Sequence, residues 1–279
     1  MKFLFISDYS LKHTKGGAQR SNDLIINKGL KLGHEVTLFN YDSDLNILNE
    51  NYDHIISSNL ERISHSLPTV VDWLTKIPNH SRLEHDKCSY LHPHKRQALF
   101  SNCKNTFFLS EYHHHLFINS YGNYFNNVRI VLDPIDTDVF FDKHNVKENK
   151  VLNVGFMHYL KGTETFLSYA ISHPEINFVM AGWGSAVYEL AAKNCKNIEF
   201  LGSVAYDQMP DLYNKYTDLF YVPVVEEPFC RSVAEAKLCG MRITTNENIG
   251  CLHELARIGE DKFKYNCKNA AEQFWNHFA

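Results

Sequence analysis

Short apolar segments rich in β-branched residues alternate with helical segments along almost the whole chain of 279 residues. The alternation begins with a predicted strand at Lys2–Ser7, a predicted helix at Ala18–Leu32 and a second strand at Glu35–Asn40. Further segments continue it: strands at His54–Ser57, Thr69–Trp73, Thr106–Leu109 and Arg129–Leu132, and a helix at Glu111–Ser120. Strands that alternate with helices form parallel sheets covered by helices on both faces, so the pattern predicts the α/β class.

A polar segment without periodicity, Asp142–Asn149, interrupts this pattern and is typical of a linker. The alternation then restarts with strands at Val151–Phe156, Asn177–Ala181, Ile198–Leu201, Leu219–Val224 and Arg242–Thr245, and helices at Thr163–Ser172, Ala186–Asn194, Asp207–Lys215, Ser232–Cys239, Cys251–Ile258 and Ala270–Phe278. We therefore predict two Rossmann-like domains, residues 1–145 and 146–265, and a closing segment, 266–279, that packs back toward the N-terminal domain. Ligands bind at the carboxyl ends of strands in such sheets, so two facing sheets predict a ligand cleft.

Composition and charge exclude several classes of protein. No run approaches the roughly 18 apolar residues of a membrane span, and Asp8 interrupts the apolar start, so neither a span nor a signal peptide is expected. The seven cysteines are odd in number and form no CxxC pair, which favours reduced thiols and a cytoplasmic protein. A net charge of -4 without a Lys/Arg stripe argues against general DNA binding, although a local groove stays open. Richness in Asn, Lys, Ile, Phe and Tyr suggests an A/T-rich gene, as in some phages or low-GC bacteria.

The segment Glu226–Gly240 carries the most chemical information. It follows an apolar strand and opens a helix, with Glu227 in the loop and Glu235 inside the helix. The backbone N–H groups from Phe229 to Ser232 form the helix start, which binds phosphate or sugar oxygens without a metal. A carboxylate within the helix can accept hydrogen bonds from two neighbouring ribose hydroxyls. The alternative interpretation is an acidic cap and an exposed helix glutamate.

This segment, EPFCRSVAEAKLCG, resembles the E-P-F-G-x-x-x-x-E-A-x-A-x-G signature of family 4 glycosyltransferases with the GT-B fold. Further segments match that family in the right order and extend the resemblance over nearly the whole chain: Lys15–Arg20, Leu109–Glu111, Asp133–Phe140, Val154–Gly162 and Asn248–Glu254. The resemblance implies two Rossmann-like domains whose parallel sheets face each other across a cleft. It also implies that the C-terminal domain binds the nucleotide-sugar donor and the N-terminal domain the acceptor.

The resemblance also implies roles for particular residues. Glu227 contacts the donor sugar, Glu235 the ribose and Lys161 the diphosphate, while His85 faces the donor sugar; Glu227, Lys161 and His85 are the predicted catalytic residues. The other predicted donor-binding residues are Gly16, Gly17, Arg20, Gly155, Phe229, Cys230, Arg231 and Ser232. Other interpretations stay open: a solvated Lys161, a flexible turn at the two glycines, and a surface histidine at position 85.

Two positions depart from the family pattern. Phe156 stands where the family usually has an arginine, so one diphosphate cation is missing, and Arg231 is a candidate substitute. Cys230 replaces the glycine of the family signature. If that position needs a positive φ or a close approach, the cysteine crowds the donor sugar.

We therefore predict a retaining glycosyltransferase that moves a sugar from a UDP- or GDP-sugar to an acceptor hydroxyl. The acceptor is a glycan, a lipid-linked sugar or a modified nucleic-acid base, and peripheral membrane contact stays open. No metal or other cofactor is expected, because the adjacent His113, His114 and His115 point in different directions on a helix. The first alternative is a non-catalytic nucleotide or nucleotide-sugar binding protein. A dinucleotide-dependent oxidoreductase ranks lower, because KGGAQRS lacks the GxGxxG spacing.

Overall fold

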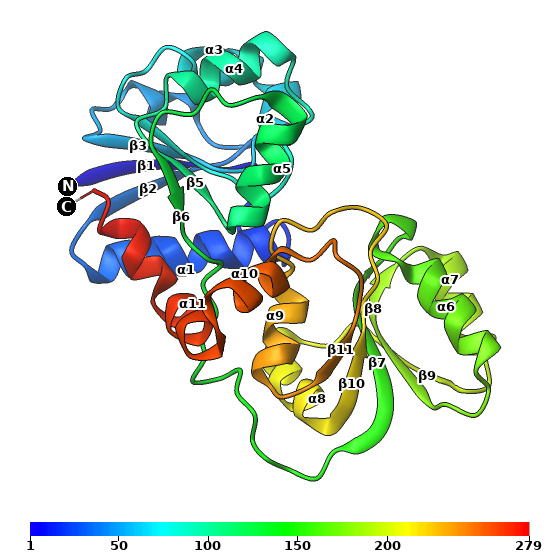
Figure 1. The fold of residues 1–279 in the computed structure, drawn as a ribbon. Helices are drawn as coiled ribbons and strands as arrows, with labels where there is room; N and C mark the ends of the chain where they lie inside the picture. The colour runs from blue at the N-terminus through cyan, green and yellow to red at the C-terminus, as the bar shows by residue number, and fades with distance from the viewer. Residues whose placement is uncertain (279) are drawn as a thin grey trace. The chain divides into compact units, whose positions relative to one another are not determined.

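The computed structural model describes residues 1–278 and divides the chain into two compact units (Figure 1). The N-terminal unit comprises Met1–Pro134 together with the residues from Asp261 onward, and the C-terminal unit comprises Ile135–Glu260. The limits expected from the sequence were residues 145 and 265. Each unit contains one sheet in which every strand pair is parallel. The predicted α/β class with two parallel sheets is therefore confirmed.

The N-terminal unit is built on a six-stranded sheet with the order β2-β1-β3-β4-β5-β6. Its strands are β1 (Lys2–Ile6), β2 (Glu35–Phe39), β3 (His54–Ser57), β4 (His80–Leu83), β5 (Thr106–Phe108) and β6 (Val128–Ile130). Its helices are α1 (Gly17–Lys31), α2 (Glu61–Ser66), α3 (Pro68–Leu74), α4 (Pro93–Ser101), α5 (Glu111–Tyr121) and α11 (Glu260–Trp275), with a 3₁₀ helix, η1 (Leu45–Asn49).

Alternate residues of β1 supply the two faces of this sheet with buried side chains. Leu4 and Ile6 join the core formed with α2, α3, α4 and α5. Phe3 lies on the other face, where its ring centroid is 4.8 Å from that of Trp275 on α11. The Trp275 indole N–H donates to the carbonyl of Ile25 on α1 at 2.7 Å, so the last helix packs beside the first (Figure 1).

The C-terminal unit is built on a five-stranded sheet with the order β11-β10-β7-β8-β9. Its strands are β7 (Glu148–Met157), β8 (Phe178–Gly184), β9 (Ile198–Gly202), β10 (Tyr216–Phe220) and β11 (Arg242–Thr244). Its helices are α6 (Thr163–Ser172), α7 (Ala186–Asn194), α8 (Met209–Lys215), α9 (Arg231–Leu238) and α10 (Gly250–Ile258), with two 3₁₀ helices, η2 (Tyr159–Lys161) and η3 (Tyr206–Gln208).

Several predicted elements are wrong or incomplete. Thr69–Trp73 forms part of helix α3 rather than a strand, because Pro68 begins the helix and Val70, Val71 and Leu74 share its buried face. Strand β4 was not predicted, since its sequence, HSRL, is polar although all four residues are buried. The strand predicted at Leu219–Val224 ends at Phe220, and the helix predicted at Ala270–Phe278 begins at Glu260.

Two further sequence predictions concern the membrane and the linker. Among residues 1–278, no helix combines the length and the apolar character that crossing a bilayer requires. The segment predicted as a linker ends inside a strand, because β7 already begins at Glu148.

Candidate active site

Lys161 lies at the carboxyl end of β7, on a short turn whose geometry depends on a glycine. The 3₁₀ helix η2 ends at Lys161, and Gly162 then adopts a left-handed φ of 77° before α6 begins. A Cβ atom at Gly162 would collide with the carbonyl oxygen of Val222, which follows the neighbouring strand β10. Only glycine combines this φ with this close approach, so Gly162 fixes where Lys161 is held.

Glu227 lies in the loop that follows β10, and its backbone is fixed by a second loop. Its N–H donates to the carbonyl of Asn248 at 2.7 Å, and its carbonyl accepts from the N–H of Gly250 at 2.9 Å. The Glu227 carboxylate is 2.6 Å from the Lys161 Nζ and also accepts a hydrogen bond of 3.3 Å from the Tyr221 hydroxyl. Since β7 and β10 are neighbours, the two residues predicted to act on the donor meet at the carboxyl edge of the sheet.

Glu235 lies in the second turn of α9 and is almost fully buried. Its Oε1 accepts from the Arg231 Nε at 2.8 Å and from the Tyr206 hydroxyl at 2.7 Å. The Arg231 Nη2 also donates to the Tyr206 oxygen at 2.9 Å, which closes a triangle of three polar side chains. Burial, and next the charge of Glu235, raise the pKa of Tyr206, so this hydroxyl remains a donor to the carboxylate.

Cys230 has the unusual backbone conformation that its position in the family signature suggested. It caps α9 with φ 69° and ψ 79°, and among the described residues the only other non-glycine with a positive φ is His144. A non-glycine residue pays roughly 1–2 kcal/mol for this left-handed conformation. Burial raises the pKa of the Cys230 thiol, so the sulfur is protonated and acts as a small apolar group.

The remaining predicted residues of the C-terminal unit are Phe229, Ser232 and Gly155. Phe229 is buried and its carbonyl accepts from the N–H of Cys251 at 2.8 Å. Ser232 lies in the first turn of α9, and Gly155 lies in β7 opposite Gly182 of β8. The eight residues predicted in this unit thus lie at the carboxyl ends of β7 and β10 and at the start of α9.

The four predicted residues of the N-terminal unit also lie near one another. Gly16 caps α1 with an ordinary φ of -70°, Gly17 begins the helix, and the N–H of Arg20 donates to the Gly16 carbonyl at 3.2 Å. His85, in the loop after β4, is buried, and its Nε2 is 2.9 Å from the Oδ1 of Asn22 on the same helix. The alternative of a surface histidine at position 85 is therefore wrong.

A buried ion pair supports the loop that carries His85, and the sequence analysis missed it. Arg82, on β4, pairs with Glu84 and donates to the Ser57 hydroxyl at 3.1 Å and to the Tyr90 hydroxyl at 2.9 Å. Burial raises the pKa of Glu84 and the Arg82 guanidinium opposes this rise, so the carboxylate depends on Arg82 to remain ionised. Tyr206 and Tyr221 were also missed, because each lies outside the recognisable motifs.

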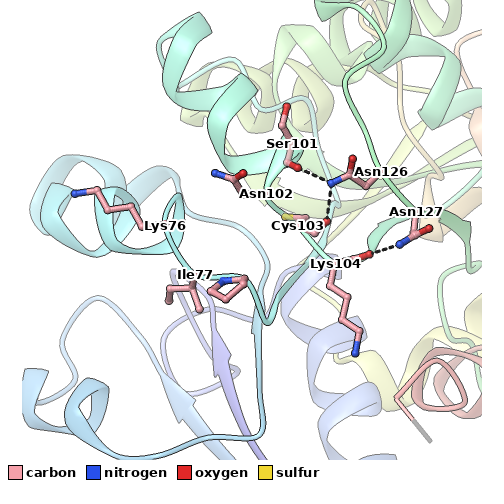
Figure 2. Close-up of a pocket in the computed structure, with 9 residues that line it drawn as sticks. Lys76, Ile77, Ser101, Asn102, Cys103, Lys104, Asn126 and Asn127 are labelled. Carbon is pink, nitrogen blue, oxygen red and sulfur yellow. Dashed lines mark hydrogen bonds between the residues drawn. The ribbon is translucent and has the colours of Figure 1, made fainter.

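A surface hollow of about 480 Å³ lies away from all of these residues (Figure 2). It is found at the amino ends of β4, β5 and β6, and its lining includes Lys76 and Lys104. Asn126 Nδ2 donates to the Ser101 carbonyl at 2.5 Å and Asn127 Nδ2 to the Lys104 carbonyl at 2.8 Å, as Figure 2 shows. None of the residues predicted to act on the donor lines this hollow.

The three adjacent histidines of α5 differ in burial: His113 lies in the N-terminal core, His114 is half-buried and His115 is exposed. His113 is fully buried on α5, and burial lowers its pKa to about 3. In the described part of the chain, no three His, Cys, Asp or Glu side chains are grouped in a way that could hold a metal ion.

Comparison with known proteins assigns the family. Residues 135–277 match the family of glycosyl transferases group 1. The chain belongs to this family. No curated protein matches the sequence.

Solved structures match nearly the whole chain. Sucrose-phosphate synthase from Thermosynechococcus elongatus has a TM-score of 0.72 at 10% identity and is matched over 99% of this chain and 96% of that one. Anabaena Alr3699/HepE, in complex with UDP and glucose, has a TM-score of 0.65 at 15% identity over 99% and 95% of the two chains. An alpha-glucosyltransferase in complex with UDP and a 13-mer DNA containing an HMU base has a TM-score of 0.61 at 15% identity over 100% and 98%.

Family and fold together decide between the three functional interpretations. The two parallel sheets match GT-B glycosyltransferases, and the family is one of glycosyltransferases. This glycosyltransferase is therefore an enzyme, which sets aside both the non-catalytic binding protein and the oxidoreductase.

Proposed function

We propose that this glycosyltransferase is a retaining, family 4 enzyme that transfers a sugar from a UDP- or GDP-sugar to an acceptor hydroxyl without a metal. One observation carries the proposal: the 2.6 Å pair between Lys161 and Glu227 at the carboxyl ends of β7 and β10. The pair places a cation and a carboxylate where α/β sheets bind their ligands.

Lys161 supplies the positive charge that a departing nucleoside diphosphate needs. Charge builds on the leaving phosphate as the sugar–oxygen bond breaks, and a fixed cation stabilises it. Lys161 stands at the end of η2, directly before α6, while α9 begins at Arg231, a few residues after Glu227. Both helix starts favour an anion, so the lysine and two helix termini act on the same group.

Glu227 and Glu235 recognise the two ends of the donor. Glu227 exchanges its contact with Lys161 for hydroxyls of the donor sugar once the diphosphate occupies the lysine. Glu235 accepts from Arg231 and Tyr206 through Oε1, and these contacts hold its carboxylate in place for the ribose hydroxyls. Arg231 orients Glu235 through this contact, and its role as a substitute for the missing arginine stays a prediction.

The transfer proceeds on one face of the donor sugar. The bond from the anomeric carbon to the diphosphate oxygen breaks, and the acceptor oxygen forms its bond on the same face. The acceptor proton passes to the departing diphosphate oxygen, so the anomeric configuration is retained. His85 and the turn formed by Gly16, Gly17 and Arg20 contribute to binding the sugars. The acceptor hydroxyl belongs to a glycan, a lipid-linked sugar or a modified DNA base.

The seven cysteines are all free, which supports a reducing compartment, and we place the reaction in the cytoplasm, with peripheral contact to a membrane where the acceptor is lipid-linked.

A donor panel tests the proposal first. UDP-, GDP-, ADP- and TDP-sugars are compared by thermal shift, starting with UDP-sugars because HepE and the alpha-glucosyltransferase were solved with UDP. The true donor at about 100 times its dissociation constant adds ~2.7 kcal/mol of stability. Product NMR then gives the anomeric configuration, and EDTA should leave the rate unchanged. An inverted product or a rate lost with EDTA would refute the corresponding part of the proposal.

Two variants test the residues. Lys161→Ala and Glu235→Ala should each lose most of the transfer activity, and circular dichroism checks that each variant is folded, because Glu235 is half of a buried pair with Arg231. The controls are Lys215→Ala and Glu189→Ala, whose side chains form exposed ion pairs with Glu148 and Lys193 elsewhere in the same unit. Transfer at the wild-type rate in either site variant would remove that residue from the mechanism.

A further inference from the structure

Four ring side chains lie together at the carboxyl ends of β7 and β8, and none of them has a role in the reaction described so far. They are Phe156, His158, Tyr159 and Trp183. Phe156 is 42% exposed, Tyr159 51% and Trp183 58%. Rings of this size are usually more deeply buried, so a continuous group of exposed rings marks a surface that binds something.

The rings form one continuous row. Phe156 pairs with Trp183 across the two strands, and their ring centroids are 4.7 Å apart with an angle of 58° between the planes. His158 stacks on Phe156 at 5.8 Å, and its own centroid is 4.6 Å from that of Tyr159. Phe156 and Trp183 therefore form a tilted pair of rings in contact, and the row leads from this pair into η2.

Glycines and a local hydrogen bond make this row rigid. Gly182 and Gly184 flank Trp183, and a Cβ atom at either would collide with the backbone of Gly155 or Met157 on β7. The two strands are therefore closely apposed on both sides of the Phe156–Trp183 pair. His158 accepts a hydrogen bond from the N–H of Leu160 at 3.3 Å, which fixes its ring. A surface that is ordered before its ligand arrives loses little entropy on binding.

The position of the row identifies its ligand. Tyr159 and Lys161 belong to the same 3₁₀ helix, so the row ends beside the cation assigned to the diphosphate. A ligand that carries both a planar ring and a diphosphate can contact both features. We propose that Phe156 and Trp183 stack the nucleobase of the donor, an inference that rests on the proposed function and names a further binding site for it.

The departure at position 156 gains a physical reason from this assignment. Where the family usually has an arginine, this chain has a phenylalanine whose ring contacts Trp183. The cation is thus exchanged for an aromatic wall. Base–aromatic stacking tolerates different bases, because each base presents a flat face. Affinity for the nucleotide is therefore expected to depend on stacking of the flat face of the base more than on the hydrogen-bonding groups at the edge of the base.

Binding measurements with fragments of the nucleotide test the proposal. UDP, GDP and inorganic pyrophosphate are titrated by calorimetry into the wild type, Trp183→Ala and Trp183→Phe. Trp183→Ala should weaken the nucleotide that binds best by about tenfold and leave pyrophosphate binding unchanged. Trp183→Phe should restore most of the affinity, because it keeps a ring. Tyr265→Ala removes a ring that is 63% exposed on α11 and should have no effect.

A variant at position 156 should change pyrophosphate binding, which the Trp183 variants leave unchanged. Phe156→Arg should tighten pyrophosphate binding and reduce the preference for nucleotide over pyrophosphate, because it replaces the aromatic wall with a cation. Equal losses of nucleotide and pyrophosphate binding in Trp183→Ala, or an unchanged nucleotide affinity, would overturn the stacking site. A raised KM for the acceptor at unchanged nucleotide affinity would overturn it too, by assigning the rings to the acceptor.

The failure of this inference can be told from the failure of the proposed function. If the wild type binds no nucleotide, both fall. If the wild type binds and transfers normally and Trp183→Ala matches it in nucleotide affinity, only the stacking site falls.

Discussion

Two ion pairs, one in each unit, lie in opposite surroundings, although each unit is a parallel sheet covered by helices. In the C-terminal unit the pair of Lys161 and Glu227 lies in loops beyond the strands, where the lysine side chain is 39% exposed. In the N-terminal unit Arg82 lies inside strand β4 and pairs with Glu84 directly after it, and both are buried. The Lys161–Glu227 pair is thus partly open to solvent, as the proposed contact with the donor requires, whereas the Arg82–Glu84 pair is part of the core.

The largest expected effect is on the buried pair. Arg82→Met leaves the Glu84 carboxylate without its guanidinium in the core, and breaking a buried pair from one side costs about 3–5 kcal/mol of unfolding free energy. Burial raises the pKa of Glu84, so the variant can protonate this carboxyl, and the loss should grow as the pH rises. Chemical denaturation at several pH values measures it.

The matched control is an ion pair of the same chemistry in the other unit. Arg242 binds Asp218 through two hydrogen bonds of 2.8 and 2.7 Å, but its side chain is 73% exposed. Arg242→Met should therefore cost no more than about 1 kcal/mol. Equal losses in the two variants would mean that burial does not decide what these two ion pairs contribute to stability.

The next effect concerns a glycine in the C-terminal unit. Gly162→Ala combines a left-handed φ with a collision against the Val222 carbonyl, and should cost about 3 kcal/mol. Gly202 has a similar φ of 68° with no atom near its Cβ position, so Gly202→Ala measures the cost of φ alone, about 1–2 kcal/mol. The difference between the two variants in unfolding free energy measures the cost of the collision with the Val222 carbonyl. If they unfold alike, the Lys161 turn is not held by packing against β10.

Buried histidines should make the stability of the N-terminal unit fall as the pH is lowered. Burial, and next the charge of Arg82, lower the pKa of His80 from 6.5 to about 3. A lowered pKa means that the folded state prefers the neutral ring, so the stabilisation is complete above pH ~6.5 and is lost as the pH falls toward 3. Between pH 7 and pH 5 the loss for one such histidine is about 2 kcal/mol. His113, also lowered to about 3, adds to it.

The units can be followed separately by fluorescence. In Trp183→Phe the remaining tryptophans, Trp73 and Trp275, both belong to the N-terminal unit. Their unfolding transition should move to lower denaturant concentration when the pH is changed from 7 to 5. The C-terminal unit lacks this liability, because His158 and His173 are half-buried and His144 and His253 are exposed. A transition that does not move with pH would contradict the assignment of neutral, buried histidines.

The same contrast explains what the sequence predicts well. In the C-terminal unit the apolar strands and the spacing of Glu227 and Glu235 lie within one contiguous segment, so the strand–loop–helix order was predictable. Strand β4 was not predicted because its buried polar side chains are satisfied by residues outside the strand. His80 hydrogen-bonds to Ser57 at 2.6 Å, and Arg82 hydrogen-bonds to Tyr90. Polar residues satisfied by such partners leave no periodicity in the sequence.

Side-chain partners within the candidate site were harder to predict than backbone elements. Glu235 was expected to meet a ligand, yet its contacts with Tyr206 span 29 positions in the chain and follow from no motif. Likewise His85 was placed beside the first helix only by a family resemblance, and its bond to Asn22 spans 63 positions. Local pattern defines where a strand ends, whereas packing of distant segments decides which side chain meets another.

The smallest expected effect concerns the backbone conformation of a single residue, Cys230. Cys230 occupies a left-handed φ of 69° where the family signature has glycine. Comparing Cys230→Gly with Cys230→Ala separates the backbone from the side chain, because both variants remove the buried sulfur. The glycine variant should be more stable than the alanine variant by about 1 kcal/mol, since only glycine adopts this φ without strain. Equal stability would show that the start of α9 relaxes to another conformation, and Lys161 would then face a helix terminus shaped differently from the one described here.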